Sequence, residues 1–221
     1  MRLRTSLRRL HVWLAWIVGV PILFWTASGL WMVARPIDEV RGTALRAAPV
    51  SLRPPPVLVP PRGRALRSLA LEIQAGRPVW IVGYPNGGAG RADPATGAML
   101  PALTEPEARA VARAALARPP GVLAATRTGA HAPPIELRRA RPAWAVTFEG
   151  GVRVYLDADS GAVLALRTEQ WRWFDWMWGL HIMDLNGREA TSHPVLIASA
   201  ALALLATLVG LVLLPLGTRR R

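Results

Sequence analysis

The sequence contains no cysteine and no lysine. Without cysteine, the chain can form no disulfide, no thiolate metal site and no thiol nucleophile. The motifs of serine hydrolases, zinc peptidases and P-loop proteins are also missing, and no pair of carboxylates predicts a hydrolytic centre. We therefore expect no catalytic residues, no metal site and no stand-alone enzymatic activity.

Acidic residues are scarce: 14 aspartates and glutamates stand against 27 basic residues, all of them arginine, and the net charge is +13. A strongly basic chain can indicate nucleic-acid binding. Here, however, seven of the arginines flank two apolar stretches, and the others are spread without forming a basic helix. We therefore expect no nucleic-acid partner.

Two long stretches lack charged residues altogether, namely residues 12–34 and residues 195–216. At a rise of about 1.5 Å per residue, each is long enough to cross a hydrocarbon core of about 30 Å. Both predict transmembrane helices, which makes the lipid bilayer the first expected partner. In the second stretch, Ala206 and Gly210 form a pair of small residues four apart, where we expect the first helix to pack closely.

The arginines near these stretches predict an orientation. Four of them precede the first stretch, and residues 219–221 follow the second. By the positive-inside rule, residues 1–11 and 217–221 are expected to be cytoplasmic tails, which places the centre of the chain in the periplasm outside a bacterial inner membrane. A cleaved signal peptide is the alternative for the N-terminal part, but this apolar run is too long and too rich in tryptophan, which favours a retained anchor.

The central region begins with a proline-rich connector, residues 35–61, in which Pro54, Pro55 and Pro56 predict an extended spacer. A periplasmic domain over residues 62–170 follows. It contains two half-repeats, about 62–100 and 104–166. The motif R-P-x-W-x-V at residues 77–82 recurs 64 residues later at 141–146, and D-x-x-[ST]-G at 93–97 recurs with the same offset at 157–161.

Each half predicts strands joined by turns, because apolar and polar residues alternate and glycine supplies the positive φ that tight turns need. Thr104 can cap a helix that runs to about residue 117, and acidic residues in its first turn favour the positive helix end. Residues 64–74 predict a corresponding helix. We therefore expect an α+β fold, with two transmembrane helices flanking an antiparallel sheet that carries helices on one face.

Residues 171–194 form a tryptophan-rich segment, which contains four indoles between residues 171 and 178. Indole rings favour the headgroup level of a bilayer, so the segment predicts a helix lying in the outer interface. Arg172 and Asp175 are expected to pair one turn apart. An aromatic platform for electron transfer is the alternative interpretation.

These features together resemble a known family. In the second half-repeat, the helix from Thr104, the stretches 142–146 and 154–157, and Ser160 with Gly161 are similar to a PepSY domain. The flanks resemble the PepSY-associated transmembrane family, at residues 10–14, 28–30, 179–181 and 187–188. The resemblance covers nearly the whole chain. The first half-repeat departs from it, because residues 84–91 are glycine-rich where a strand pair is expected, which indicates a degenerate copy.

The resemblance implies a cofactor, since larger members of the family include ferric-siderophore reductases whose membrane histidines hold haem. Of the four histidines, His11, His181 and His193 are the candidate haem b ligands, and His131 is expected to be a solvated loop residue. His11 and His193 would lie on opposite sides of the bilayer and cannot share one iron. His181 and His193 lie on the same side and can ligate one haem. An inner haem would need a second His11 from a homodimer, or a ligand from another protein.

Two interpretations of the histidines and of the function remain open. His193 can instead cap the second helix, and His11 can be an interfacial polar residue. The first functional hypothesis is an inner-membrane accessory subunit in haem-linked electron transfer, related to iron or siderophore uptake. The second is a membrane-tethered, non-enzymatic periplasmic module that binds or regulates a peptidase, sensor or transporter through an exposed strand edge.

Overall fold

The computed structural model describes residues 2–52 and 57–218, which fold into two units. One unit contains Met1–Pro36 and Trp173–Arg221, and the other contains Ile37–Arg172. The first unit is helical. The second contains the eight strands of the described residues, so the structure has the predicted α+β composition.

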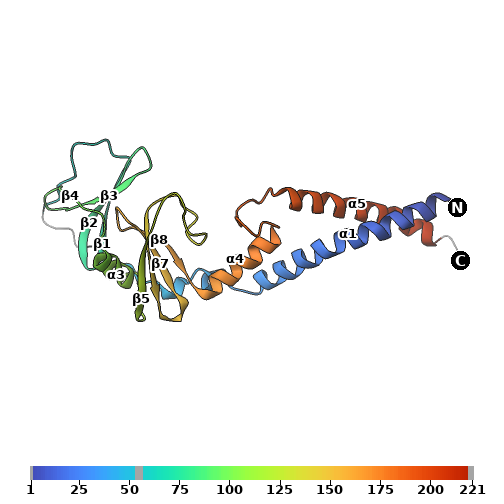
Figure 1. The fold of residues 1–221 in the computed structure, drawn as a ribbon, viewed down its shortest axis with the longest axis horizontal. Coiled ribbons are helices and arrows are strands. Elements are labelled where there is room, and N and C mark those ends of the chain that lie inside the picture. Colours follow the sequence, from blue (N-terminus) through green and yellow to red (C-terminus); the bar gives the residue numbers. More distant parts are fainter. Residues whose placement is uncertain (1, 53–56, 219–221) are drawn as a thin grey trace. The chain divides into compact units, whose positions relative to one another are not determined.

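The helical unit consists mainly of α1 (Arg2–Val33) and α5 (Pro194–Thr218), which lie side by side (Figure 1). The buried apolar residues of these two helices are Leu14 and Val18 of α1 and Ala206 and Val209 of α5. Both helices are long and apolar enough to cross a membrane. Only 11% and 6% of their most apolar windows are buried, as expected of helices that face lipid rather than a protein core.

These two helices cover the predicted spans, residues 12–34 and 195–216. Helix α1 begins ten residues earlier than the first predicted span, because Arg4, Arg8 and Arg9 continue the helix as exposed side chains. The basic residues 219–221, on which the predicted orientation of the second tail depends, lie outside the described residues.

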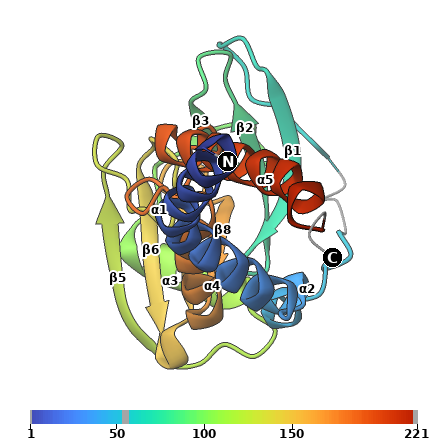
Figure 2. The ribbon, with the colours of Figure 1, turned by 90° about the vertical axis from the view of Figure 1, so that its right-hand side faces the viewer.

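The other unit contains two four-stranded antiparallel sheets, each with its strands in sequence order (Figures 1 and 2). The strands of the first sheet are β1 (Ser68–Gln74), β2 (Arg77–Gly83), β3 (Ala89–Ala92) and β4 (Met99–Leu100). Those of the second sheet are β5 (Val122–Thr128), β6 (Ala143–Phe148), β7 (Arg153–Asp157) and β8 (Val163–Arg167). Between the sheets in sequence lies helix α3 (Glu105–Ala114), and short helical turns occur at Ile37–Val40 (α2), Thr43–Leu45 (η1) and Glu149–Gly151 (η2).

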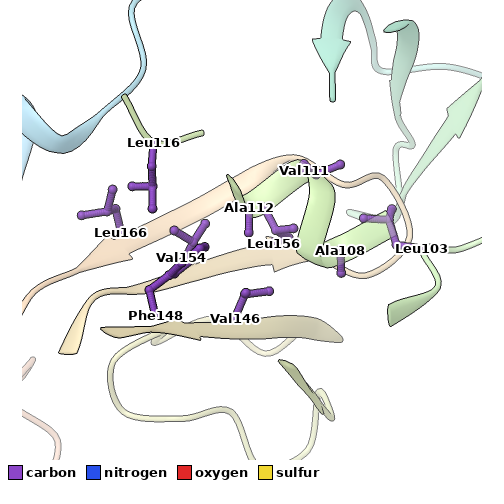
Figure 3. Close-up of a cluster of buried hydrophobic side chains, with 10 residues drawn as sticks. All are labelled: Leu103, Ala108, Val111, Ala112, Leu116, Val146, Phe148, Val154, Leu156 and Leu166. Atoms are coloured by element: carbon purple, nitrogen blue, oxygen red, sulfur yellow. The ribbon is translucent and has the colours of Figure 1, made fainter. Parts of the chain in front are cut away.

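Helix α3 and one face of the second sheet form the main core (Figure 3). The alternation of β6 and β7 directs their apolar side chains toward the helix, and Ala108 and Ala112 are small enough to let it approach. Burial of this face holds α3 on the sheet. The cluster comprises Leu103, Ala108, Val111, Ala112, Leu116, Val146, Phe148, Val154, Leu156 and Leu166.

The two copies of the R-P-x-W-x-V motif make matching hydrogen bonds. In the first copy, the Trp80 indole donates to Val59 O, and Val59 N donates to Pro94 O. In the second copy, Trp144 donates to Leu103 O, and Leu103 N donates to Ala158 O. Each motif tryptophan therefore binds a preceding segment of the chain, the one before β1 in the first copy and the one before α3 in the second.

The two D-x-x-[ST]-G turns also match. Asp93 Oδ1 accepts hydrogen bonds from the backbone N–H groups of residues 95 and 96, and Asp157 Oδ1 accepts those of residues 159 and 160. Gly97 and Gly161 have φ values of 73° and 75°, which favour glycine at this turn position. These aspartates are therefore turn caps, as predicted.

Two predictions for the first half-repeat are wrong. Residues 64–74 do not form a helix; Ser68–Gln74 is strand β1. Its apolar residues recur with a period of two, and Ala75 and Gly76, with φ values of 47° and 82°, make a tight hairpin turn to β2. The first half-repeat is also not degenerate at residues 84–91. These glycine-rich residues form the turn after β2 and most of strand β3, which pairs with β2 and β4.

The proline-rich connector is only partly extended. Its first part forms α2 and η1, and Val40 is 1% exposed. Hydrogen bonds join Ala47 N to Ala115 O and Ala117 N to Leu45 O, so this part packs on the end of α3. The prediction for Pro54, Pro55 and Pro56 lies outside the described residues.

Helix α3 begins as the sequence predicts, with Thr104 as its N-cap. Glu107 accepts hydrogen bonds from Thr104 N at 2.8 Å and from Arg91 Nη2 at 2.7 Å. Partial burial acts to raise the pKa of Glu107, but these hydrogen bonds outweigh it and lower the pKa to about 2. The stabilisation is therefore present above the ordinary value of 4.5 and is lost as the pH falls through about 2.

We predict that Glu107→Gln lowers stability at neutral pH and flattens its acid dependence between about pH 4.5 and 2. Because the Glu107 side chain is 43% exposed, solvent screening limits the expected loss to about 1 kcal/mol. Glu105→Gln is the matched control, since it removes an acid from the same helical turn but breaks only an exposed pair with Arg109. Thermal unfolding as a function of pH measures both, and equal effects of the two substitutions would contradict the assignment.

Candidate functional site

Only the first part of the tryptophan-rich segment, residues 171–181, is helical, as part of helix α4 (Glu169–His181); residues 182–193 form a loop. Trp173 and Trp176 are 55% and 47% exposed, whereas the Trp178 indole donates a hydrogen bond to Arg188 O at 3.2 Å. The exposed indoles are available to a bilayer or a partner. The interfacial position of this helix stays a prediction.

The predicted pair of Arg172 and Asp175 does not form. Arg172 Nε lies 2.6 Å from Glu136 Oε1, and Asp175 Oδ2 lies 2.9 Å from Arg188 Nη1. Asp175 is 4% exposed, so its charge requires a close partner, which the loop after α4 supplies when it turns back over the helix.

Asp184 organises that loop. Its carboxylate accepts hydrogen bonds from the backbone N–H groups of Gly187, Ala190 and Glu189, which lower its pKa to about 2. Asp184 therefore holds residues 187–190 of the loop that returns to α5.

His181 ends α4 and lies against α1. Its Nδ1 is 3.0 Å from Trp25 O and 3.3 Å from Ser28 Oγ. Its ring stacks on Trp25, with 4.9 Å between centroids and 19° between planes, and Trp178 stacks at 6.5 Å. A Cβ atom on Gly29 would lie 3.0 Å from His181 Cε1, so the close approach depends on that glycine.

His11 makes a corresponding contact between α1 and α5. Its Nδ1 lies 3.0 Å from Ala206 O, and a Cβ atom on Gly210 would lie 3.0 Å from its Cε1. The prediction that Ala206 and Gly210 admit the first helix is confirmed, and His11 is the side chain that enters.

In each contact, the imidazole lies over a glycine and reaches the carbonyl four residues before it, Trp25 for Gly29 and Ala206 for Gly210. A carbonyl oxygen only accepts hydrogen bonds, so Nδ1 must carry the proton in the neutral ring. Nε2 then keeps its lone pair. This is the arrangement usual for metal-ligating histidines, in which the second ring nitrogen donates to a backbone carbonyl or another acceptor.

The two histidine contacts lie near opposite ends of the apolar part of α1. Residues 11 and 29 are separated by about 27 Å along a helix that rises about 1.5 Å per residue. His11 and His181 therefore cannot ligate the same iron.

His193 lies directly before α5, and its carbonyl accepts a hydrogen bond from Ile197 N. Its backbone therefore takes part in starting the helix. Its Nδ1 is buried and has no hydrogen-bond partner among the described residues. His181 contacts Trp25 and Ser28, whereas the His193 ring makes no hydrogen bond through Nδ1 within the described residues. The pairing of the two histidines on one haem stays a prediction. His131 is exposed, as expected.

Two apolar hollows adjoin the histidine contacts. A cavity of about 320 Å³ is lined by Pro21, Trp25, Met183 and residues of α5. A more open groove of about 540 Å³ runs along α1 beside His11, Ala15 and Gly19. His11 lines the groove, whereas the lining of the cavity includes Trp25 but neither His181 nor His193. No cluster of three ligating side chains for a bare metal ion occurs within residues 2–52 and 57–218.

Sequence reasoning selected the histidines but missed what holds them. In the sequence, Ser28 and Gly29 stand out only within residues 28–30 of the family resemblance. For His11, the available signal is the pair of small residues Ala206 and Gly210, which leaves space on one face of α5 for a side chain of the other helix. For His181 the partners are more than 150 residues away in sequence, and no local pattern indicates them.

Comparison with known proteins gives one match. A family model described as the PepSY-associated TM region matches residues 8–221. No curated protein and no solved structure matches the chain. The matched family and the two exposed apolar helices indicate a membrane protein.

We predict that Gly29→Val displaces His181 from α1 and lowers the thermal midpoint of the protein in detergent. Gly19→Val is the matched control in the same helix, because a Cβ atom at Gly19 meets no atom within 4 Å. Both substitutions introduce the same β-branched residue, so their difference reports the contact with His181. A difference of at least about 1 kcal/mol is expected from the steric conflict, and equal midpoints would contradict it.

Proposed function

Since the chain belongs to the PepSY-associated transmembrane family, we propose that it is an inner-membrane accessory subunit in haem-linked electron transfer. The observation that carries this proposal is the tautomer imposed on His11 and His181. Each presents Nε2 as a free ligand atom, because Nδ1 is bound to a backbone carbonyl.

His181 is the proposed ligand of an outer haem b, with His193 as the second axial candidate. His193 keeps a buried Nδ1 without a partner among the described residues, and Ile182 to Ser192 provide the connection between the two histidines. His11 is the proposed ligand of an inner haem, whose second ligand would come from another copy in a homodimer or from a partner protein. Haem b supplies one-electron transfer when it is bound.

The chain's own residues serve to fix the ligands in place. The Gly29 and Gly210 positions admit the imidazoles, and Trp25 O and Ala206 O hold the Nδ1 protons. The Trp25 and Trp178 rings stack with His181 and help to orient its imidazole. The family resemblance supports ferric compounds, including siderophores, as the eventual electron acceptors.

The proposed orientation places both termini in the cytoplasm and the domain of residues 62–170 in the periplasm. Three exposed arginines of α1, at positions 4, 8 and 9, support a cytoplasmic start. The His181 end of α1 would then lie at the periplasmic side.

Protein purified from haem-replete cells should show a Soret band. His181→Gly should lose the outer haem and regain its absorbance when imidazole is added, because the added ring can occupy the vacated space. His193→Ala should lose the same component, and His131→Ala is the matched control that retains it. Colourless wild-type protein, or an unchanged spectrum in both ligand variants, would refute the haem assignment.

The orientation is tested separately with reporters fused to the two ends. Alkaline phosphatase, which is active only outside the inner membrane, should be inactive at both ends and active when inserted between Gly129 and Ala130, in the exposed loop before β6. Activity at either end would overturn the two-pass topology, whatever the result for haem.

The alternative proposal is a tethered module without a cofactor that binds a peptidase, sensor or transporter. It is supported by the strand order, in which β1 and β4 are edges of one sheet and β5 and β8 are edges of the other. An unpaired edge can accept an added strand from a partner. Colourless but well-folded protein in the spectral experiment favours this alternative.

A further inference from the structure

A second candidate site lies in the unit Ile37–Arg172, and its lining includes no histidine. It is a cavity of about 450 Å³ between one face of the first sheet and helix α3. The charged residues in its lining are Arg77, Arg91 and Glu107. The proposed function uses none of them in electron transfer.

The internal repeat shows why this face is open. In the second sheet, a 14-residue loop joins β5 to β6 and covers the corresponding face. Leu137 from that loop packs on Ala143 and Tyr155, which are both fully buried. In the first sheet, only Ala75 and Gly76 join β1 to β2, so this connection is too short to cover the equivalent surface, where the cavity lies.

The two copies also differ in the partner of their motif arginine. Arg141 Nε forms an ion pair with Asp157 Oδ2 at 3.0 Å. Arg77 holds the same position in the first R-P-x-W-x-V motif, but it forms no ion pair within the part of the chain that the structure describes, and it lines the cavity as an exposed residue. The Arg77 guanidinium is therefore available to a ligand, whereas the equivalent Arg141 guanidinium is already paired with Asp157.

Arg91 provides a second, better-fixed guanidinium. The residue is 6% exposed, and its Nε and Nη2 are held by Pro101 O and Glu107 Oε1. Its Nη1 has no partner among the described residues. With Arg77 and Glu107 counted, the lining carries a net charge of +1, which suits a monoanion better than a dianion.

The rest of the lining is mixed. Val79, Leu100 and Val111 supply apolar surface. Gln74, which is also 6% exposed, donates its Nε2 to Ser160 O, while its buried Oε1 accepts no hydrogen bond within the described residues.

We propose that this cavity binds a small monocarboxylate with an apolar body. The carboxylate pairs with the Arg77 guanidinium and with Arg91 Nη1, since guanidinium groups match carboxylate oxygens in geometry and charge. The apolar body lies on Val79, Leu100 and Val111. The site is independent of the histidines, so its test and that of haem binding can fail separately.

Hexanoate is the probe, titrated into the full chain in detergent and followed by calorimetry. Hexanamide is the neutral analogue, and inorganic phosphate is the anion without an apolar body. We expect hexanoate to bind, and hexanamide and phosphate to bind at least tenfold more weakly. Arg77→Gln should weaken hexanoate binding roughly 10- to 100-fold, the loss typical of one charged hydrogen-bonding partner.

Arg67→Gln is the matched control. It removes the same charge from an exposed arginine outside the cavity lining, and it should leave hexanoate binding unchanged. Thermal unfolding of both variants establishes that they fold. Absence of hexanoate binding to the wild-type chain, equal weakening by the two substitutions, or phosphate binding as tight as hexanoate would each overturn the proposal.

Discussion

The helical unit depends on one constraint, that a side chain can reach the backbone of a neighbouring helix only where that helix carries no side chain of its own. Gly29 and Gly210 create such openings, and an imidazole enters each. The carbonyl reached in each case lies within an apolar helix, where an additional donor has few competitors. The same contact that fastens the helices also decides which ring nitrogen stays free.

The domain of two sheets follows a different principle, in which one hydrogen-bonded frame is used twice and covered differently. Tryptophan, aspartate and glycine at fixed positions were sufficient to predict the duplication, because those residues perform local tasks that their chemistry makes recognisable. Strand β1 differs from the predicted helix because its alternating pattern is short and its environment is set by pairing with β2. The coverage by α3 or by the long loop depends on distant packing and could not be read locally.

The candidate site shows the same division. The histidines were identified from the sequence because they are few and lie near the ends of the apolar stretches. The pairing of Arg172 with Asp175 was expected from their spacing, but the chain folds back and supplies Arg188 and Glu136 as stronger partners. Spacing along a helix predicts which residues can meet, whereas burial decides which of them must be paired.

The loop that covers the second sheet is fastened largely by Glu136. This one carboxylate contacts Arg153, Arg172 and the Tyr155 hydroxyl, and the arginines and the hydroxyl outweigh the effect of burial and lower its pKa. Without it, two guanidiniums would repel each other beneath the loop, and Leu137 would lose its hold on the sheet. The second sheet would then expose the face that corresponds to the cavity face of the first sheet. The Glu136 carboxylate thus keeps this face covered in the second half-repeat.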